Sequence, residues 1–105
     1  MDKHAAPCRF LEVEPGGALV LEVDEQRVRA VLRGARIAPS KAADANAFLA
    51  ERARRVSLRC TVRDPGPPAL VDVELLAWRD KSGDVWQNLG AALIEQGLAE
   101  PRARG

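Results

Sequence analysis

The sequence has very few of the side chains on which enzyme chemistry most often depends. Its 105 residues include one histidine, two cysteines, no tyrosine and only 4% aromatic residues. A catalytic triad, a histidine–cysteine zinc cluster and the two-histidine metalloprotease motif need imidazoles held inside the fold, so His4 alone, near the start of the chain, excludes them. Cys8 and Cys60 are too few and too far apart in the sequence for a disulfide framework or a zinc site, which favours a reducing compartment. We therefore expect no metal site and no cofactor.

Long hydrophobic runs are also absent. The longest uninterrupted apolar stretch is only a few residues, as at Gly17–Leu21, so the sequence contains no candidate membrane-spanning helix and no signal-peptide core. We expect a cytoplasmic protein with no membrane partner. With 47% apolar and 30% charged residues, a chain of this length can bury one core, which predicts a single domain over residues 1–100 and a flexible tail at 101–105.

The net charge of +1 hides an uneven distribution along the chain. Residues 1–25 carry a net charge of −4 and residues 64–105 one of −3, whereas residues 26–63 contain ten cations and two carboxylates, a net charge of +8. A basic block of this kind indicates either an anionic partner or a solvated face that acidic neighbours neutralise in the folded protein. The sequence leaves both interpretations open.

The hydrophobic pattern predicts five short strands and two helices. Period-two alternation bounded by turn residues favours strands, and the prolines at 65, 67 and 68 exclude a strand there because proline cannot donate to a ladder. We expect strands at 8–14, 18–23, 27–33, 56–62 and 70–78, a helix from Ser40 to about Ala53, and a second helix from Asp84 to just before Gly97. The order β-β-β-α-β-β-α is that of a five-stranded OB-fold, a β-barrel with helices of the α+β class.

Four residues are expected to shape the helices. Ser40 is the predicted N-cap of the first helix, and Asp84 has Gln87 three residues later, the spacing of a capping box. Gly97 is predicted to end the second helix as its C′ residue, and Gly90 to permit close packing of that helix against the barrel.

The four aromatic side chains divide into two pairs. Phe10 and Phe48 lie in apolar stripes and are expected in the core, as is Cys60. Trp78 and Trp86 stand at the ends of predicted elements, so each is either a core side chain or an exposed platform on which bases can stack. Four rings are too few for an aromatic cage around methylarginine.

Four segments in a fixed order carry a family resemblance. They are the turn Glu14-Pro15-Gly16-Gly17-Ala18-Leu19, the segment Val28–Pro39, the alanine-rich helix with Phe48-Leu49, and the ending Asn88–Ala99. Together they resemble the staphylococcal nuclease-like (SNase-like) family, whose OB-fold occurs in thermonucleases and in Tudor-associated repeats. The resemblance covers most of residues 8–100 and implies a nuclease-type barrel.

The same resemblance implies that the catalytic site is lost. Active members have Asp-Gly-Asp-Thr at the first turn and Asp-Ala-Pro-Glu or Asp-Thr-Pro-Glu after the third strand, where carboxylates hold calcium and activate water. This chain has Pro15-Gly16-Gly17-Ala18 and Ile37-Ala38-Pro39-Ser40 at those places, and Pro65-Gly66-Pro67 is the nearest match to the family's Tyr-Gly-Arg. Only the arginine of the third strand has a counterpart, Arg29 or Arg33. Calcium needs several oxygen ligands, so we expect no nuclease activity and no enzyme.

We expect a catalytically inactive binding module. The leading hypothesis is binding of single-stranded or duplex nucleic acid through an arginine-rich barrel face that comprises Arg27, Arg29, Arg33, Arg36, Arg59 and Arg63. The alternative is a protein-interaction or self-association module with no nucleic-acid role, and residual metal-dependent phosphodiester cleavage is the least favoured. Pairing of Arg29 and Arg33 with carboxylates such as Glu12, Glu22 or Glu74 across the sheet would remove the basic face and favour the alternative.

Overall fold

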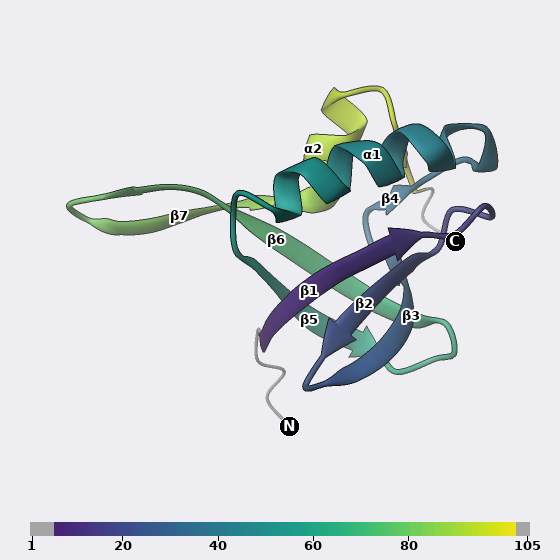
Figure 1. Ribbon diagram of the computed structural model, residues 1–105, viewed down its shortest axis with the longest axis horizontal. Helices are drawn as coiled ribbons and strands as arrows, with labels where there is room; N and C mark the ends of the chain where they lie inside the picture. Colours follow the sequence, from purple (N-terminus) through teal and green to yellow (C-terminus); the bar gives the residue numbers. More distant parts are fainter. Residues whose placement is uncertain (1–5, 103–105) are drawn as a thin grey trace.

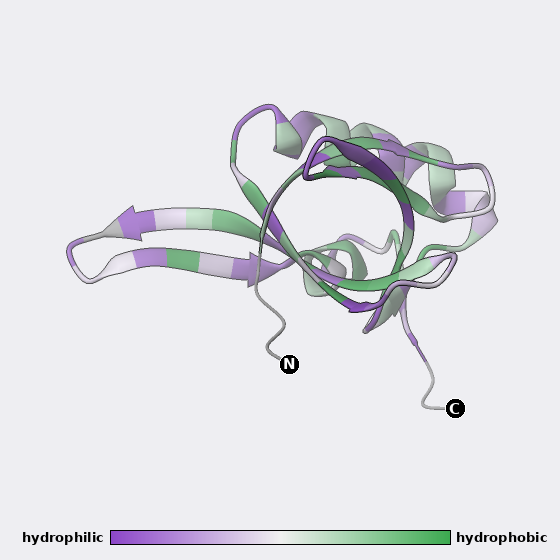
Figure 2. Cartoon of the chain, turned by 90° about the horizontal axis from the view of Figure 1, so that it is seen from below, coloured by the Kyte–Doolittle hydropathy of each residue, from purple (hydrophilic) through white to green (hydrophobic). Residues whose placement is uncertain are grey.

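The strands of the chain form a closed barrel. In a computed structural model that describes residues 6–102, β1 (Ala6–Val13), β2 (Leu19–Val23) and β3 (Gln26–Leu32) form an antiparallel meander. β5 (Leu58–Asp64) pairs with β1, and β6 (Ala69–Asp80) pairs with β5. A parallel pairing of β3 with β6 then closes the five strands, as the view along the barrel shows (Figures 1 and 2). The predicted β-barrel with helices is therefore confirmed.

Two pairings lie outside the barrel. β7 (Gly83–Asn88) pairs with the second half of β6, and the two strands project from the barrel as a hairpin arm (Figure 1). β4 (Ala35–Arg36) pairs with β8 (Glu100–Pro101) in a separate two-stranded sheet, so Pro101 belongs to a strand. The predicted tail residues 103–105 and His4 lie outside the described residues.

Both helices cover the barrel. α1 (Ala42–Ala53) follows a short 3-10 turn, η1 (Pro39–Lys41), and lies along β1 with Ala42, Ala45 and Leu49 buried at helical spacing. The Asn46 side chain of α1 accepts a hydrogen bond from the Val13 backbone N–H at 2.8 Å, which satisfies the end of β1. α2 (Leu89–Glu95) contacts β6 and β4. Among the described residues no helix is long and apolar enough to cross a membrane.

The start of the first helix differs from the prediction. Ser40 is not its N-cap: the residue at that position is Lys41, and no side chain caps the helix. Pro39 opens η1 and fixes the helical φ one turn earlier, and the Lys41 N–H donates to the Ala38 carbonyl at 2.8 Å. Ser40 therefore lies inside the 3-10 turn.

The second helix begins five residues later than predicted, because residues 83–88 form a strand. Trp86 pairs with Leu76 and Val85 pairs with Trp78 across the hairpin arm, so these β-branched and aromatic side chains act as strand formers. The N-cap is Asn88, whose side chain accepts from the Ala91 N–H at 2.9 Å. The capping-box interpretation of Asp84 and Gln87 was wrong, since a three-residue spacing recurs by chance in a strand.

The end of that helix follows the prediction. Gly97 has φ +75°, the left-handed conformation of a C′ glycine, and the Leu98 N–H bonds the Leu93 carbonyl at 2.9 Å. Gly90 lies so close to β4 that a Cβ atom there would be 3.0 Å from the Cβ of Ala35. Gly97 therefore has its predicted role, whereas the close approach of Gly90 is to β4 and not to a barrel strand.

The core fills the barrel and the space under the helices. Its fully buried side chains include Leu19, Leu21, Val71, Val73, Leu75, Leu89 and Leu93, with Cys60 among them. Phe10 and Phe48, both predicted in the core, are half-buried and pack against its edge.

The two cysteines are neighbours in space despite their distance in the sequence. Cys8 pairs with Leu58 and Cys60 with Ala6, which places the two residues diagonally across β1 and β5, and both are buried free thiols. The hydrogen bond with Cys60, together with burial, raises the pKa of the Cys8 thiol above its ordinary value. Cys8 is therefore an unreactive part of the core.

Candidate anion site

Five of the six predicted arginines lie beside a carboxylate from another part of the sheet. We call these contacts the ion-pair ladder; its pairs are Arg27–Glu12 at 3.7 Å, Arg29–Glu14, Arg33–Asp72 at 3.1 Å, Arg63–Asp72 at 2.7 Å and Arg59–Glu74 at 2.9 Å. Arg9 and Glu22 add a further pair at 3.6 Å. The carboxylates come from the two segments with a net negative charge, residues 1–25 and 64–105. The sheet therefore places these acidic segments next to the basic block at 26–63.

Asp72 is the most enclosed carboxylate of the ladder, with its side chain only 16% exposed between Arg33 and Arg63. Partial burial acts to raise the pKa of Asp72, but hydrogen bonds from the two guanidinium groups outweigh burial and hold this pKa below its ordinary value. Asp72 therefore stays charged at neutral pH and holds two arginines, which come from the end of β3 and from β5.

Arg59 is held from two sides. Its Nε donates to Glu74, its direct partner on β6, and its guanidinium lies 4.1 Å from the centre of the Trp86 ring. Trp86 is thus half-buried against a cation. Trp78, by contrast, is 58% exposed on the hairpin arm, so only one of the two tryptophans presents most of its ring to solvent.

The ladder largely neutralises the predicted basic face. Four carboxylates, Glu12, Glu14, Asp72 and Glu74, lie within ion-pair distance of the five arginines. A phosphate that approached this face would have to compete with carboxylates already in place. The arrangement is the one that favours an assembly role over a broad nucleic-acid surface.

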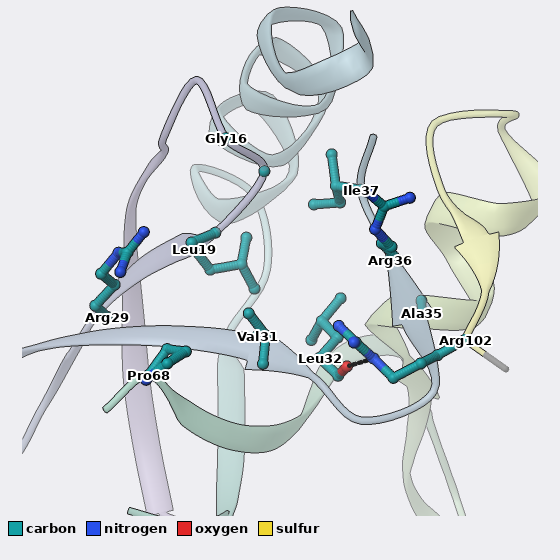
Figure 3. A pocket seen from close by; sticks show the side chains of 12 residues that line it. Gly16, Leu19, Arg29, Val31, Leu32, Ala35, Arg36, Ile37, Pro68 and Arg102 are labelled. Atoms are coloured by element: carbon teal, nitrogen blue, oxygen red, sulfur yellow. Dashed lines mark hydrogen bonds between the residues drawn. The ribbon is translucent and has the colours of Figure 1, made fainter. Parts of the chain in front are cut away.

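Arg36 is the exception among the six arginines. It is exposed on β4, and its side chain makes no ion pair or hydrogen bond with any other described residue. It lines a cavity of about 230 Å³ together with Arg29 and Arg102, and we call this cavity the arginine pocket. Figure 3 shows Arg29 on one side of the pocket and Arg36 and Arg102 on the other.

The walls of the arginine pocket are built from three distant parts of the chain. The turn at Gly16, Gly17 and Ala18 meets the segment after β4, and a Cβ atom on Gly17 would lie only 2.1 Å from the Ile37 carbonyl oxygen. Gly17 has φ +97°, so glycine is required both for space and for the backbone conformation. Leu19, Val31 and Leu32 form the apolar floor between these walls (Figure 3).

Arg102 reaches the pocket because the end of the chain is tied to the barrel. β8 pairs with β4, the Arg102 backbone N–H donates to the Gly34 carbonyl at 3.2 Å, and the Arg102 Nε donates to the Leu32 carbonyl at 3.1 Å. The sequence predicts a flexible tail at 101–105, which includes this residue. Two-residue strands such as β4 and β8 are too short for periodicity to detect, so the sequence offers no signal for it.

The lining of the pocket does not fit a calcium ion. None of its twelve lining residues is aspartate or glutamate. Across residues 6–102, moreover, no three histidine, cysteine or acidic side chains are grouped as metal ligands would be. Three guanidinium groups around a small cavity suit an anion, since arginine presents five N–H donors in a planar fork.

No protein-family model and no curated protein matches this chain. The conclusions about function therefore depend on the geometry of the chain itself.

Proposed function

We propose that this chain is a non-catalytic SNase-like binding module that holds a phosphate group of nucleic acid in the arginine pocket. One observation carries the proposal: Arg29, Arg36 and Arg102 surround a cavity whose lining contains no carboxylate. Of the three arginines only Arg29 has an ion-pair partner among the described residues, Glu14. Arg36 and Arg102 therefore leave positive charge at the pocket that no described carboxylate compensates.

The family resemblance supports this choice of site. It aligns residues 15–18 and 37–40 with the segments that hold the metal and the catalytic base in active nucleases, and both segments contribute to the wall of the arginine pocket through Gly16, Gly17 and Ile37. The strand β3 also supplies Arg29, one of the two candidates for the single arginine that the resemblance retains. An SNase-like OB-fold in which arginines remain and carboxylates are gone would bind a phosphodiester without cleaving it.

The dimensions of the pocket favour one phosphate over a whole ligand. Pockets that enclose complete cofactors measure about 300–1,000 Å³, and this cavity measures about 230 Å³. Arginine binds phosphate oxygens in bidentate fashion, and an apolar floor strengthens such contacts because it excludes water. We therefore expect recognition of a terminal phosphate or a single backbone phosphate, with little sequence preference.

Fluorescence anisotropy of short labelled DNA and RNA strands, with and without a 5′-phosphate, tests the proposal. We expect binding that weakens as salt rises, because each phosphate contact releases counterions. The double variant Arg36→Glu/Arg102→Glu should weaken binding by about tenfold or more at low salt. The matched control is Arg9→Glu/Arg27→Glu, a charge reversal of the same size at two arginines paired with Glu22 and Glu12, and it should have a smaller effect.

Two outcomes would overturn the proposal. Equal losses in the pocket variant and the ladder control would show that the pocket has no special role. Accumulation of cleavage products when calcium and DNA are added to the wild-type chain would show that the protein is a nuclease after all.

The second candidate function is a protein-interaction or assembly module. The ion-pair ladder favours it, because paired arginines leave little basic surface for a polyanion. Absence of oligonucleotide binding at low salt, in protein shown to be folded by circular dichroism, would move the conclusion to this candidate.

A further inference from the structure

The hairpin arm has no part in the proposed anion site. It consists of β7 and the second half of β6, and it projects sideways from the barrel in both views (Figures 1 and 2). Trp78 lies on this arm with 58% of its surface exposed. The fold therefore leaves a large aromatic side chain in solvent on a projecting element, and tryptophan is enriched at protein interfaces.

The outer edge of β7 is open. In the described part of the chain the only strand that pairs with β7 is β6, so the side of β7 that faces away from β6 has no neighbouring strand. No backbone hydrogen bond other than its pairing with β6 is made by β7 to the described residues. An open edge of unpaired N–H and C=O groups is a template for another strand.

We infer that this edge and Trp78 form a self-association surface, on which β7 of a second copy of the chain pairs in antiparallel orientation. The low charge of β7 is the reason for proposing a second copy of the chain as the binding partner. Within residues 83–88 the only charged side chain is Asp84, and it already pairs with Arg79 at 3.3 Å. The edge therefore attracts neither a polyanion nor a strongly charged peptide, and it does not repel itself.

The sequence of β7 is compatible with two-fold pairing. A two-fold axis perpendicular to the sheet must lie midway between a residue of β7 and the same residue of the second copy, since directly opposite residues point to the same face. With the axis at Trp86, Val85 would face Gln87 and Asp84 would face Asn88 of the second copy. With the axis at Val85, Asp84 would face Trp86. Neither register opposes like charges, and the apolar side chains lie near the axis.

The association is expected to be weak. A six-residue strand is about 20 Å long, and stable protein interfaces bury about 800 Å² per partner. An edge of this length, even with the Trp78 ring added, is below that area. The inferred dimer should therefore form at tens of micromolar or above, and the surface is separate from the arginine pocket, which lies on other strands.

Sedimentation equilibrium of the full chain, from about 5 to about 500 µM, tests the inference. The average mass should rise from 11.4 kDa toward twice that value. Val85→Lys should keep the chain monomeric, because a lysine on an edge strand opposes pairing. Trp78→Lys, on the neighbouring β6, should weaken association because it removes the exposed ring from the contact. The matched control is Leu11→Lys, which changes the other large exposed hydrophobic side chain, 37% exposed on β1, and should associate like the wild type.

Hydrogen exchange locates the contact independently. Amides of β7 that point away from β6 should become more protected as the concentration rises, whereas those of β2 should not change. A wild-type chain that stays monomeric at about 500 µM, or equal loss of association in Leu11→Lys and Trp78→Lys, overturns the inference. If Trp78→Lys weakens oligonucleotide binding while the wild type remains monomeric, Trp78 stacks on bases and the self-association surface is refuted, although the arginine pocket is not.

Discussion

The arginines of the ladder and the two further arginines of the arginine pocket, Arg36 and Arg102, are the same side chain in two different electrostatic situations. In the ladder each guanidinium lies beside a carboxylate from another strand or turn, as Arg33 and Arg63 do beside Asp72. At the pocket, Arg36 has no such partner among the described residues and Arg102 bonds only to backbone carbonyls of the described chain. The number of arginines on a sheet therefore does not determine its affinity for anions. The positions of the neighbouring carboxylates determine it, because they set how much positive charge is left uncompensated.

The largest expected effect comes from the pocket wall. Gly17→Ala would place a methyl group against the Ile37 carbonyl and impose a left-handed conformation on alanine, so we expect a loss of about 2–3 kcal/mol in the free energy of unfolding. Urea denaturation measures it. Gly16→Ala is the control, since nothing lies within 4 Å of a Cβ atom there. Equal stabilities of the two variants would show that the two walls do not meet as described.

Removing the carboxylate shared by two ladder arginines should leave these arginines without a charged partner, as Arg36 is in the pocket among the described residues. Asp72→Asn takes the charge from Arg33 and Arg63, and should cost about 1–2 kcal/mol of stability, while oligonucleotide affinity at low salt increases. Anisotropy and urea denaturation measure the two changes. Glu51→Gln, which affects only the exposed Arg55 pair on α1, should change neither quantity. A decrease in oligonucleotide affinity in Asp72→Asn would contradict the comparison.

The stabilising effect of Asp72 should depend on pH. Because its pKa is lowered in the folded state, the folded protein binds fewer protons at this group than the unfolded chain does. The contribution is therefore fully present above the ordinary pKa of 3.8, and it is lost as the pH falls through the lower folded value. The stability difference between the wild type and Asp72→Asn should be constant from pH 7 to pH 5 and shrink near pH 3. A difference that persists unchanged at low pH would contradict this assignment.

The smallest effect is expected at the outermost pair of the ladder. Arg27 and Glu12 are 3.7 Å apart and both are largely exposed, so Arg27→Ala should change stability by no more than about 0.5 kcal/mol. Thermal unfolding at low and high salt measures it. A loss above 1 kcal/mol that disappears in high salt would mean that the ladder stabilises the barrel cooperatively.

Part of the fold can be predicted from local patterns. Alternation of apolar and polar residues is enough to place β1, β2, β3, β5 and β6 within a few residues, because one face of each strand is buried. Gly97 marks the end of α2 because its left-handed conformation is costly for other residues. The strand from Gly83 to Asn88 cannot be predicted from its own residues, because its conformation depends on pairing with Leu76 and Trp78.

The candidate site is less predictable than the fold. Arg36 is among the predicted binding residues and does line the pocket, whereas Arg102 was assigned to a tail and reaches the pocket only through the β4–β8 pairing. Arg59 and Glu74 are directly opposite each other on β5 and β6, a consequence of register that neither segment reveals alone. A one-residue shift of register would move Glu74 to the other face of the sheet.

By itself, the sequence determined which residues can enter a core and which chemistries are missing. The alternating strands, the single histidine and the absence of carboxylates at 15–18 and 34–41 are properties of the chain as written. Which arginines are neutralised by carboxylates, and which line the arginine pocket, depends on the tertiary structure. Arg33 and Asp72 are 39 residues apart in the sequence yet form an ion pair, because charge compensation acts over a few ångströms in space and the register of the closed barrel sets those distances.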